Sequence, residues 1–320
     1  MRCGASVSRI GDDGAGLMRL FPGRVTIKRV IKRTAGVAST WLRPFVSHPD
    51  DPRVCILVYH RVAPLRFVDP DFDSWNVSPD MIERQIAFLA ETTEIVALDD
   101  IPARTSRPVT RASSKPLVCL TFDDGFGNFH HEVLPVLRKY GVQATLFVVT
   151  KFVGSPEPMP FDRWARRHCA DVSPSCWRPI TWRELDDCVE SGLVTIGSHS
   201  HEHRIGSTCS LDELRREAEQ SRAVLLGRLG PRHAACYAYP YGSSRPALVP
   251  AGYVQAVKAA GYQLAVSTDL GLAKGTSDRF FLPRIEAFAL DSPAVLRAKV
   301  DGALTPYIIP QWLRTARRTA

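Results

Sequence analysis

The sequence predicts an α/β domain with mainly parallel strands, built either as a closed barrel or as a doubly wound sheet. Strand-like and helix-like segments alternate about six to eight times over about 250 residues, which is typical of both folds. Several strand candidates are continuous apolar runs, such as VCILVYHRV at 54–62, and such runs indicate strands covered on both faces. In both folds the loops after the C-terminal strand ends carry the functional side chains.

The elements of the first half can be assigned in chain order. The strand at 54–62 is followed by a helix at 78–92, where Ser78 is a suitable N-cap. Further on, we expect a strand at 94–98, a turn and short helix at 99–105, a strand at 116–122, a helix at 130–141 and a strand at 143–149.

The second half continues the alternation after one interruption. Residues 153–180 are rich in proline and aromatic residues, which indicates an irregular insertion. Thr181 with Glu184, and Ser210 with Glu213, have the spacing of capping boxes and so mark two helix starts. The expected elements are helices at 181–192, 210–230, 253–261 and 292–304, and strands at 193–200, 235–240, 262–268 and 280–285.

The amino-acid composition limits which classes of protein the chain can belong to. The chain has 320 residues, of which 45% are hydrophobic, enough for one large domain or two of ordinary size. No apolar run reaches the roughly 18 to 20 residues of a membrane span, and the first residues contain no apolar stretch typical of a secretory signal. The 8 cysteines are scattered without a CxxC pair, which favours free thiols in a reducing compartment. We therefore expect a cytoplasmic protein.

The net charge of +8 is concentrated at the two ends of the chain. Residues 1–49 hold nine basic and two acidic residues, and the last ten residues hold three basic ones, so the middle is slightly acidic. This argues against a nucleic-acid-binding protein. We expect a basic N-terminal extension at 1–50, a catalytic domain at 51–305 and a basic tail at 306–320.

The N-terminal extension contains a predicted basic amphipathic helix at 24–36. Ile27, Val30, Ile31 and Thr34 share one helical face, and lysines and arginines fill the other. The favoured interpretation is a surface helix packed on the domain. The alternative is a helix on an anionic membrane face, which would make the protein peripheral to the inner membrane.

Four predicted strand ends carry polar side chains of the kinds that act in catalysis or bind metals. They are His60, the pair Asp123 and Asp124, the group His199, His201 and His203, and the turn Tyr239, Pro240 and Tyr241. Singly, each has an ordinary explanation, since DDG and YPYG are common turns and a lone histidine is usually just hydrogen-bonded. In either predicted fold, however, all four lie on the same rim.

This combination predicts metal-assisted hydrolysis. Two imidazoles and a carboxylate form a three-ligand site with open positions, which suits Zn²⁺ or a similar divalent ion. Asp123 and Asp124 cannot both ligate easily, because neighbouring side chains diverge. One is therefore expected to hold the metal, and the other to act as a general base.

TFDDG at 121–125 and HSHEH at 199–203 resemble the first two motifs of the polysaccharide deacetylases of carbohydrate esterase family 4. The resemblance covers roughly residues 54–290 and implies a distorted (β/α) barrel with about seven strands. It implies Asp123 as the catalytic base and three metal ligands: Asp124, His199 and His203.

The third motif departs from the family pattern. It reads CYAYPYG at 236–242 and lacks the usual arginine, which positions the base. Arg284 ends another predicted strand and is the expected substitute, because a buried arginine needs a partner and Asp123 is a natural one. The resemblance implies that the backbone N–H of Tyr241 stabilises an oxyanion. Tyr239, Pro240 and Tyr241 are expected to bind substrate, with packing as the alternative for the tyrosines.

The family's late histidine is also missing, since no histidine follows His233. A branch that resembles the poly-N-acetylglucosamine deacetylases has a circularly permuted barrel with an early YH strand. His60 in VYHRV matches that position, so we expect it to act as general acid or oxyanion partner.

The resulting hypothesis is a Zn²⁺-dependent hydrolase that removes N-acetyl groups from an amino-sugar glycan or glycan precursor and releases acetate. A nucleotide-, lipid- or oligosaccharide-linked sugar is the expected substrate. Two alternatives are a metal amidase that acts on a non-sugar acetamide and a non-catalytic carbohydrate-binding relative.

Overall fold

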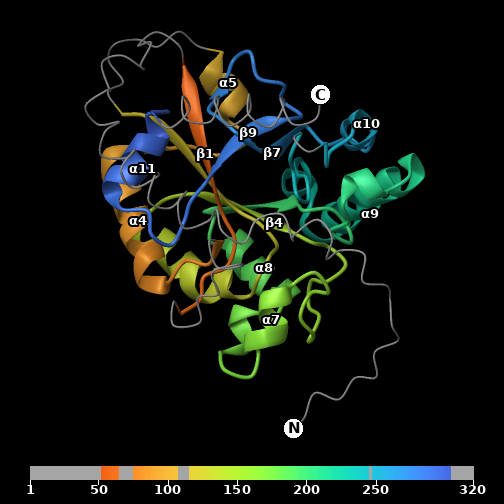
Figure 1. Ribbon diagram of the computed structural model, residues 1–320, viewed down its shortest axis with the longest axis horizontal. Coiled ribbons are helices and arrows are strands. Elements are labelled where there is room, and N and C mark those ends of the chain that lie inside the picture. Colours follow the sequence, from red (N-terminus) through yellow and green to blue (C-terminus); the bar gives the residue numbers. More distant parts are fainter. Residues whose placement is uncertain (1–51, 65–74, 107–114, 245–246, 304–320) are drawn as a thin grey trace, which may run out of the picture.

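The computed structural model describes residues 52–64, 75–106, 115–244 and 247–303 (Figure 1). The expected helix at 24–36 and the tail at 306–320 lie outside these ranges, so the predictions for both ends, including membrane contact, stay predictions.

Seven parallel strands form a closed barrel at the centre of the molecule (Figure 1). They are β1 (Arg53–Tyr59), β3 (Leu117–Phe122), β4 (Ala144–Val148), β5 (Val194–Ser198), β6 (Cys236–Ala238), β7 (Leu264–Leu270) and β9 (Leu282–Glu286). Each strand pairs with the next in this order, and β9 pairs with β1 to close the ring. The closed ring confirms the barrel and excludes the doubly wound sheet.

The barrel is irregular in three places. β5 and β6 share a single paired position, Ser198 opposite Tyr237. The register between β7 and β9 shifts between Val266 and Leu270. The short strand β2 (Glu94–Ile95) adds to the side of β3, and β8 (Ala273–Lys274) runs antiparallel to β1. The expected distorted barrel is therefore confirmed.

Helices surround the barrel. They are α4 (Pro79–Thr92), α5 (Ile101–Thr105), α6 (Leu134–Tyr140), α7 (Arg163–His168), α8 (Trp182–Glu190), α9 (Leu211–Leu229), α10 (Ala251–Ala259) and α11 (Pro293–Val300). Figure 1 shows α4 and α11 on one side and α9 and α10 on the opposite side. Both predicted capping boxes are present, with Thr181 at the start of α8 and Ser210 at the start of α9. None of the helices in the described residues is long and apolar enough to cross a membrane.

Two segments differ from the sequence prediction. The insertion at 153–180 contains α7, whose first turn forms because the side chain of Asp162 accepts a hydrogen bond from the N–H of Ala165. The helix expected at 130–141 begins as a π turn, Phe129–Val133, before α6. Pro135 lies at the start of α6 and lacks the N–H that an unbroken α-helix would use, which fits a wider turn before it.

The strand residues separate into two apolar layers by their alternation. One layer lies between the strands and the helices and includes Leu57 and Leu120. The other includes Val54, Ile56 and Cys119, which alternate with the first set and fill the barrel interior. Continuing the inner alternation past β1 and β3 leads to His60 and Asp123, so the fold itself directs these two residues to the mouth of the barrel.

Candidate metal centre and active site

Three expected ligands meet at the C-terminal mouth of the barrel. Asp124 follows β3, and His199 and His203 belong to the loop after β5. Oδ1 of Asp124 lies 3.5 Å from Nε2 of His199 and 3.4 Å from Nε2 of His203. The two Nε2 atoms are 3.2 Å apart. The three side chains therefore present one donor atom each to a common point.

This arrangement fits a divalent cation. Donor atoms about 2.0–2.1 Å from a tetrahedral ion are separated by about 3.3 Å, close to the distances found here. The Nδ1–H of His199 donates to the carbonyl of Ala238 at 2.9 Å, which orients the ring so that Nε2 faces Asp124 and His203. The donor set, two imidazoles and one carboxylate, is one of those found in catalytic Zn²⁺ sites.

The protonation states of Asp124 and His203 favour ligation. Burial alone would raise the pKa of Asp124, but hydrogen bonds from His199 and His203 hold it well below its usual value. Burial lowers the pKa of His203, despite its contact with Asp124. His199 has a raised pKa, because the nearby carboxylates outweigh the effect of burial. An ionised carboxylate and a neutral imidazole at His203 are the protonation states that bind a cation.

The backbone around the metal group is strained. Among the described residues, the non-glycine residues with a positive φ are Asp124 (72°), Ser200 (66°), His203 (63°) and Tyr241 (57°). All four belong to the loops that build this site, where left-handed backbone redirects side chains at a cost of about 1–3 kcal/mol each. Gly125 of the TFDDG motif also has a positive φ, and a Cβ there would lie 2.9 Å from Val148.

Asp123 does not join the ligand group. Its carboxylate is buried and accepts hydrogen bonds from both terminal nitrogens of Arg284, each at 2.7 Å. Arg284 is itself buried, and its Nε donates to the carbonyl of Ser267 at 2.8 Å. The expected contact between Arg284 and Asp123 is therefore present. Burial would raise the pKa of Asp123, but the charge of Arg284 and the nearby histidines lower it, which keeps the carboxylate ionised.

His60 completes the polar mouth of the barrel. Oδ2 of Asp123 lies 4.0 Å from Nε2 of His60 and 3.9 Å from Nε2 of His199. This oxygen therefore faces the space between His60 and the metal group. His201 lies apart from the ligands, since its Nδ1 makes a 2.9 Å hydrogen bond with Oγ1 of Thr150.

The three residues of the YPYG turn are placed differently from one another. Tyr241 is 42% exposed, and its ring meets the edge of His203 at 5.0 Å between centroids, so it lies at the rim as expected. Tyr239 and Pro240 are buried. The expectation that the Tyr239 side chain binds substrate is corrected, because its hydroxyl donates to the carbonyl of Phe280 and its ring packs against Tyr253.

Three neighbours of the site were missed by the sequence analysis. Phe161, from the insertion, stacks on the ring of His203 at 3.8 Å. Trp75 is 41% exposed and stacks on His60 at 5.5 Å. Glu217 on α9 accepts hydrogen bonds from the histidine loop. Only Glu217 had a sequence signal, since a carboxylate beside Ala218 interrupts the apolar side of α9.

A second group of potential ligands lies away from the barrel mouth. It contains His130, His131 and Glu184. Glu184 already forms an ion pair with Arg178 and closes the capping box of α8. The guanidinium occupies the position of a cation, so this group is an ion-pair network.

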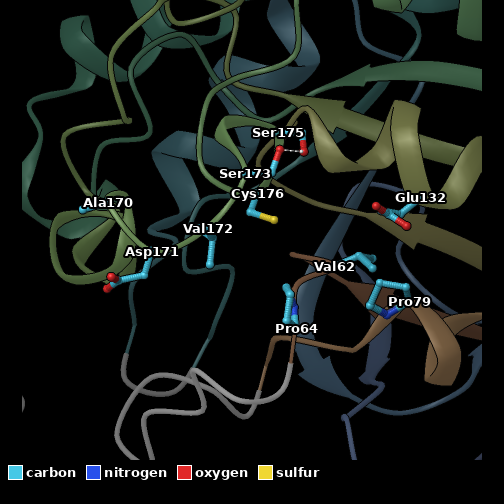
Figure 2. A pocket seen from close by; sticks show the side chains of 10 residues that line it. All are labelled: Val62, Pro64, Pro79, Glu132, Ala170, Asp171, Val172, Ser173, Ser175 and Cys176. Atoms are coloured by element: carbon cyan, nitrogen blue, oxygen red, sulfur yellow. Dashed lines mark hydrogen bonds between the residues drawn. The ribbon is translucent and has the colours of Figure 1, made fainter. Parts of the chain in front are cut away.

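A cavity of about 450 Å³ lies beside the insertion (Figure 2). Figure 2 shows Glu132 and Pro79 on one side and Asp171 and Val172 on the other. None of the metal-group residues lines it. The candidate active site is therefore the mouth of the barrel, outside this cavity.

Comparison with known proteins supports this assignment. Residues 110–265 match the family model for polysaccharide deacetylase. A Staphylococcus epidermidis poly-beta-1,6-N-acetyl-D-glucosamine N-deacetylase is 25% identical over 178 residues, covering 53% of this chain and 54% of that protein. The same enzyme from Staphylococcus aureus is 22% identical over 246 residues, covering 72% of this chain and 77% of that one. The chain spans about half the length of some curated relatives that it matches.

Solved structures share the fold. The Streptococcus pyogenes deacetylase PplD, in complex with acetate, aligns with a TM-score of 0.62 at 22% identity, over 78% of this chain and 98% of that chain. IcaB from Ammonifex degensii aligns with a TM-score of 0.59 at 20% identity, over 78% and 97% respectively. The family match includes Asp123 and Asp124 together with both ligand histidines. On these grounds residues 110–265 are similar in sequence to the polysaccharide deacetylases, and the described barrel shares the fold of solved deacetylase structures.

Proposed function

We propose that this protein is a metal-dependent hydrolase that removes N-acetyl groups from an amino-sugar glycan or glycan precursor and releases acetate. One observation carries the proposal. The ionised and buried Asp123 lies beside a His-His-Asp group, with its Oδ2 3.9 Å from Nε2 of His199. A base held next to a cation site is the arrangement that amide hydrolysis needs.

The comparisons support the substrate class. The Staphylococcus relatives carry the name poly-beta-1,6-N-acetyl-D-glucosamine N-deacetylase, and the alignment with the Staphylococcus aureus protein covers 72% of this chain. An N-acetylated hexosamine in a glycan is therefore the proposed substrate.

Each polar group at the barrel mouth has a distinct role in this proposal. A divalent cation held by Asp124, His199 and His203 would polarise the amide carbonyl when bound. Asp123 takes the proton of the attacking water at Oδ2, and Arg284 holds this carboxylate ionised and fixed in place. The backbone N–H of Tyr241, a residue exposed at the rim, would donate to the developing oxyanion.

His60 is the proposed general acid. Its Nε2 lies 4.0 Å from Oδ2 of Asp123, so both groups can reach one substrate amide from neighbouring positions. His60 donates its proton to the leaving amine nitrogen, which makes the amino sugar a viable leaving group.

The test is acetate release from N-acetylglucosamine oligomers with and without a chelator. We expect turnover that a chelator abolishes and that added Zn²⁺ restores. N-acetylated polyamines and amino acids, assayed in parallel, test the non-sugar amidase.

The His60→Ala variant supplies the matched control for catalysis, since His60 is not a metal ligand. It should bind Zn²⁺ as the wild type does and lose about 10²–10⁴-fold in turnover. Full activity on sugars in the presence of chelator, or activity on polyamines alone, would contradict the proposal. Zn²⁺ binding without acetate release from any substrate would point to a non-catalytic carbohydrate-binding protein.

A further inference from the structure

A buried carboxylate holds the loop that carries both ligand histidines. Glu217 of α9 is 4% exposed, and its Oε2 accepts hydrogen bonds from two consecutive backbone N–H groups. The N–H of His201 is 3.0 Å away and that of Glu202 is 2.8 Å away. One carboxylate oxygen from α9 thus accepts hydrogen bonds from both N–H groups in the middle of the turn between His199 and His203.

This turn needs such an anchor because its backbone is strained. Ser200 and His203 both adopt left-handed φ, at 66° and 63°. Strain of about 1–3 kcal/mol per residue persists only where surrounding contacts enforce it. The loop after β4 supplies two contacts, from the N–H of Thr150 to Ser200 and from the N–H of Lys151 to His201. Glu217 supplies two further contacts from α9, and these are charge-assisted.

We propose that Glu217 is a positioning residue for the metal centre. It fixes the turn so that the Nε2 atoms of His199 and His203 converge on Asp124 before any cation arrives. This inference rests on the proposed metal-dependent function. It assigns to α9 a role in metal affinity that is separate from its packing role through Leu214, Ala218 and Leu225.

The experiment compares two substitutions of nearly equal length. Glu217→Gln keeps an oxygen that can accept both N–H groups, whereas Glu217→Met removes the acceptor. Zn²⁺ affinity is measured by competition with a chromogenic chelator, and amide hydrogen exchange at His201 and Glu202 is measured in the metal-free protein. We expect Glu217→Met to raise the Kd for Zn²⁺ by about 10 to 100-fold and to accelerate exchange at both amides. Glu217→Gln should stay close to the wild type.

Glu219 on the exposed side of α9 provides the control, and Glu219→Met should change neither readout. Unchanged Zn²⁺ affinity and exchange in a folded Glu217→Met variant would overturn the inference. If that variant does not fold, Glu217→Asp replaces it, because a shorter side chain withdraws the oxygen from the loop. Wild-type affinity and exchange in Glu217→Asp would equally overturn the inference. A wild type that binds no Zn²⁺ would defeat the proposed function, while amide exchange in the metal-free protein still decides whether Glu217 holds the loop.

Discussion

Asp123 and Asp124 are adjacent in sequence but serve different partners. The positive φ of Asp124 turns its carboxylate toward His199 and His203, whereas Asp123 continues the inward alternation of β3 and meets Arg284. Both carboxylates have lowered pKa values despite their burial, but for different reasons. Arg284 and the nearby histidines lower the pKa of Asp123, and hydrogen bonds from the ligand histidines lower that of Asp124. The two aspartates thereby take different roles, Asp123 as the proposed base and Asp124 as the proposed ligand.

This division predicts opposite effects of two equivalent substitutions. Asp124→Asn removes the charged ligand atom, so we expect most of the bound Zn²⁺ to be lost, as measured by metal analysis after gel filtration. Asp123→Asn keeps all three ligands, so it should retain the metal and lose about 10²–10⁴-fold in turnover. If both variants keep metal and activity, the assignment of the two aspartates is wrong.

Arg284 sets the pH range in which Asp123 can act as a base. A base works only when ionised, so activity falls as the pH drops through its pKa. Because Arg284 lowers the pKa of Asp123, weakening the pair should raise that pKa and move the acid limb of the pH–rate profile to higher pH. Arg284→Lys keeps a charge but cannot make both hydrogen bonds, so we expect a shift in this direction in kcat/KM measured against pH.

Arg279 is exposed and precedes the same strand, so Arg279→Lys is the matched control and should leave the acid limb in place. An unchanged acid limb in a folded Arg284→Lys variant would show that Arg284 is not what keeps the base ionised.

At the scale of elements, hydrogen bonds at the start of α8 connect this helix to Arg178 of the insertion. The carboxylate of Glu184 accepts hydrogen bonds from the backbone and hydroxyl of Thr181 and from Arg178. Burial would raise the pKa of Glu184, but these hydrogen bonds lower it to about 2. A group with a lowered folded-state pKa stabilises the protein fully above its unfolded pKa of about 4.3, and this stabilisation is lost as the pH falls toward the folded value.

Glu184→Gln should therefore destabilise the protein at neutral pH and matter less in acid. Loss of the charged hydrogen bonds to Arg178 is expected to cost about 1.5–3 kcal/mol at pH 7. The difference between the free energies of unfolding of the variant and the wild type should narrow between pH 4.5 and 2. Urea unfolding at each pH measures it. Glu190, exposed near the end of the same helix, provides the control substitution. An equal difference at all pH values would mean that the charge of Glu184 is not responsible.

Across the whole molecule, the sequence predicted the elements and the grouping of the polar residues correctly wherever the pattern was local or repeated. Apolar runs and capping boxes located most of the strands and helices, and polar residues at strand ends located the ligand group and the contact of Arg284 with Asp123. Tyr239 was misassigned because the motif does not reveal to which side its side chain points just after β6. Tyr237 and Tyr239 alternate with Ala238 and so face the helices, not the barrel mouth.

Contacts between distant segments account for what the sequence did not reveal. Phe161 reaches His203 from the insertion, and Trp75 reaches His60 from further along the chain. Neither aromatic residue has a periodic position or a motif, so only the closed fold brings it to the site.

The barrel as a whole should be stabilised by the cation. The ligands follow β3 and β5, which are separated in the ring by β4, so a bound ion links non-adjacent strands. A ligand that binds only the folded state at 100 times its Kd stabilises it by about 2.7 kcal/mol, which corresponds to a rise in Tm of several degrees. We expect this rise in calorimetry of the metal-free protein titrated with Zn²⁺, and its absence in Asp124→Asn. His131→Ala alters the second potential ligand group and should keep the full rise. A rise that survives in Asp124→Asn and disappears in His131→Ala would place the stabilising ion at α8 instead of at the mouth of the barrel.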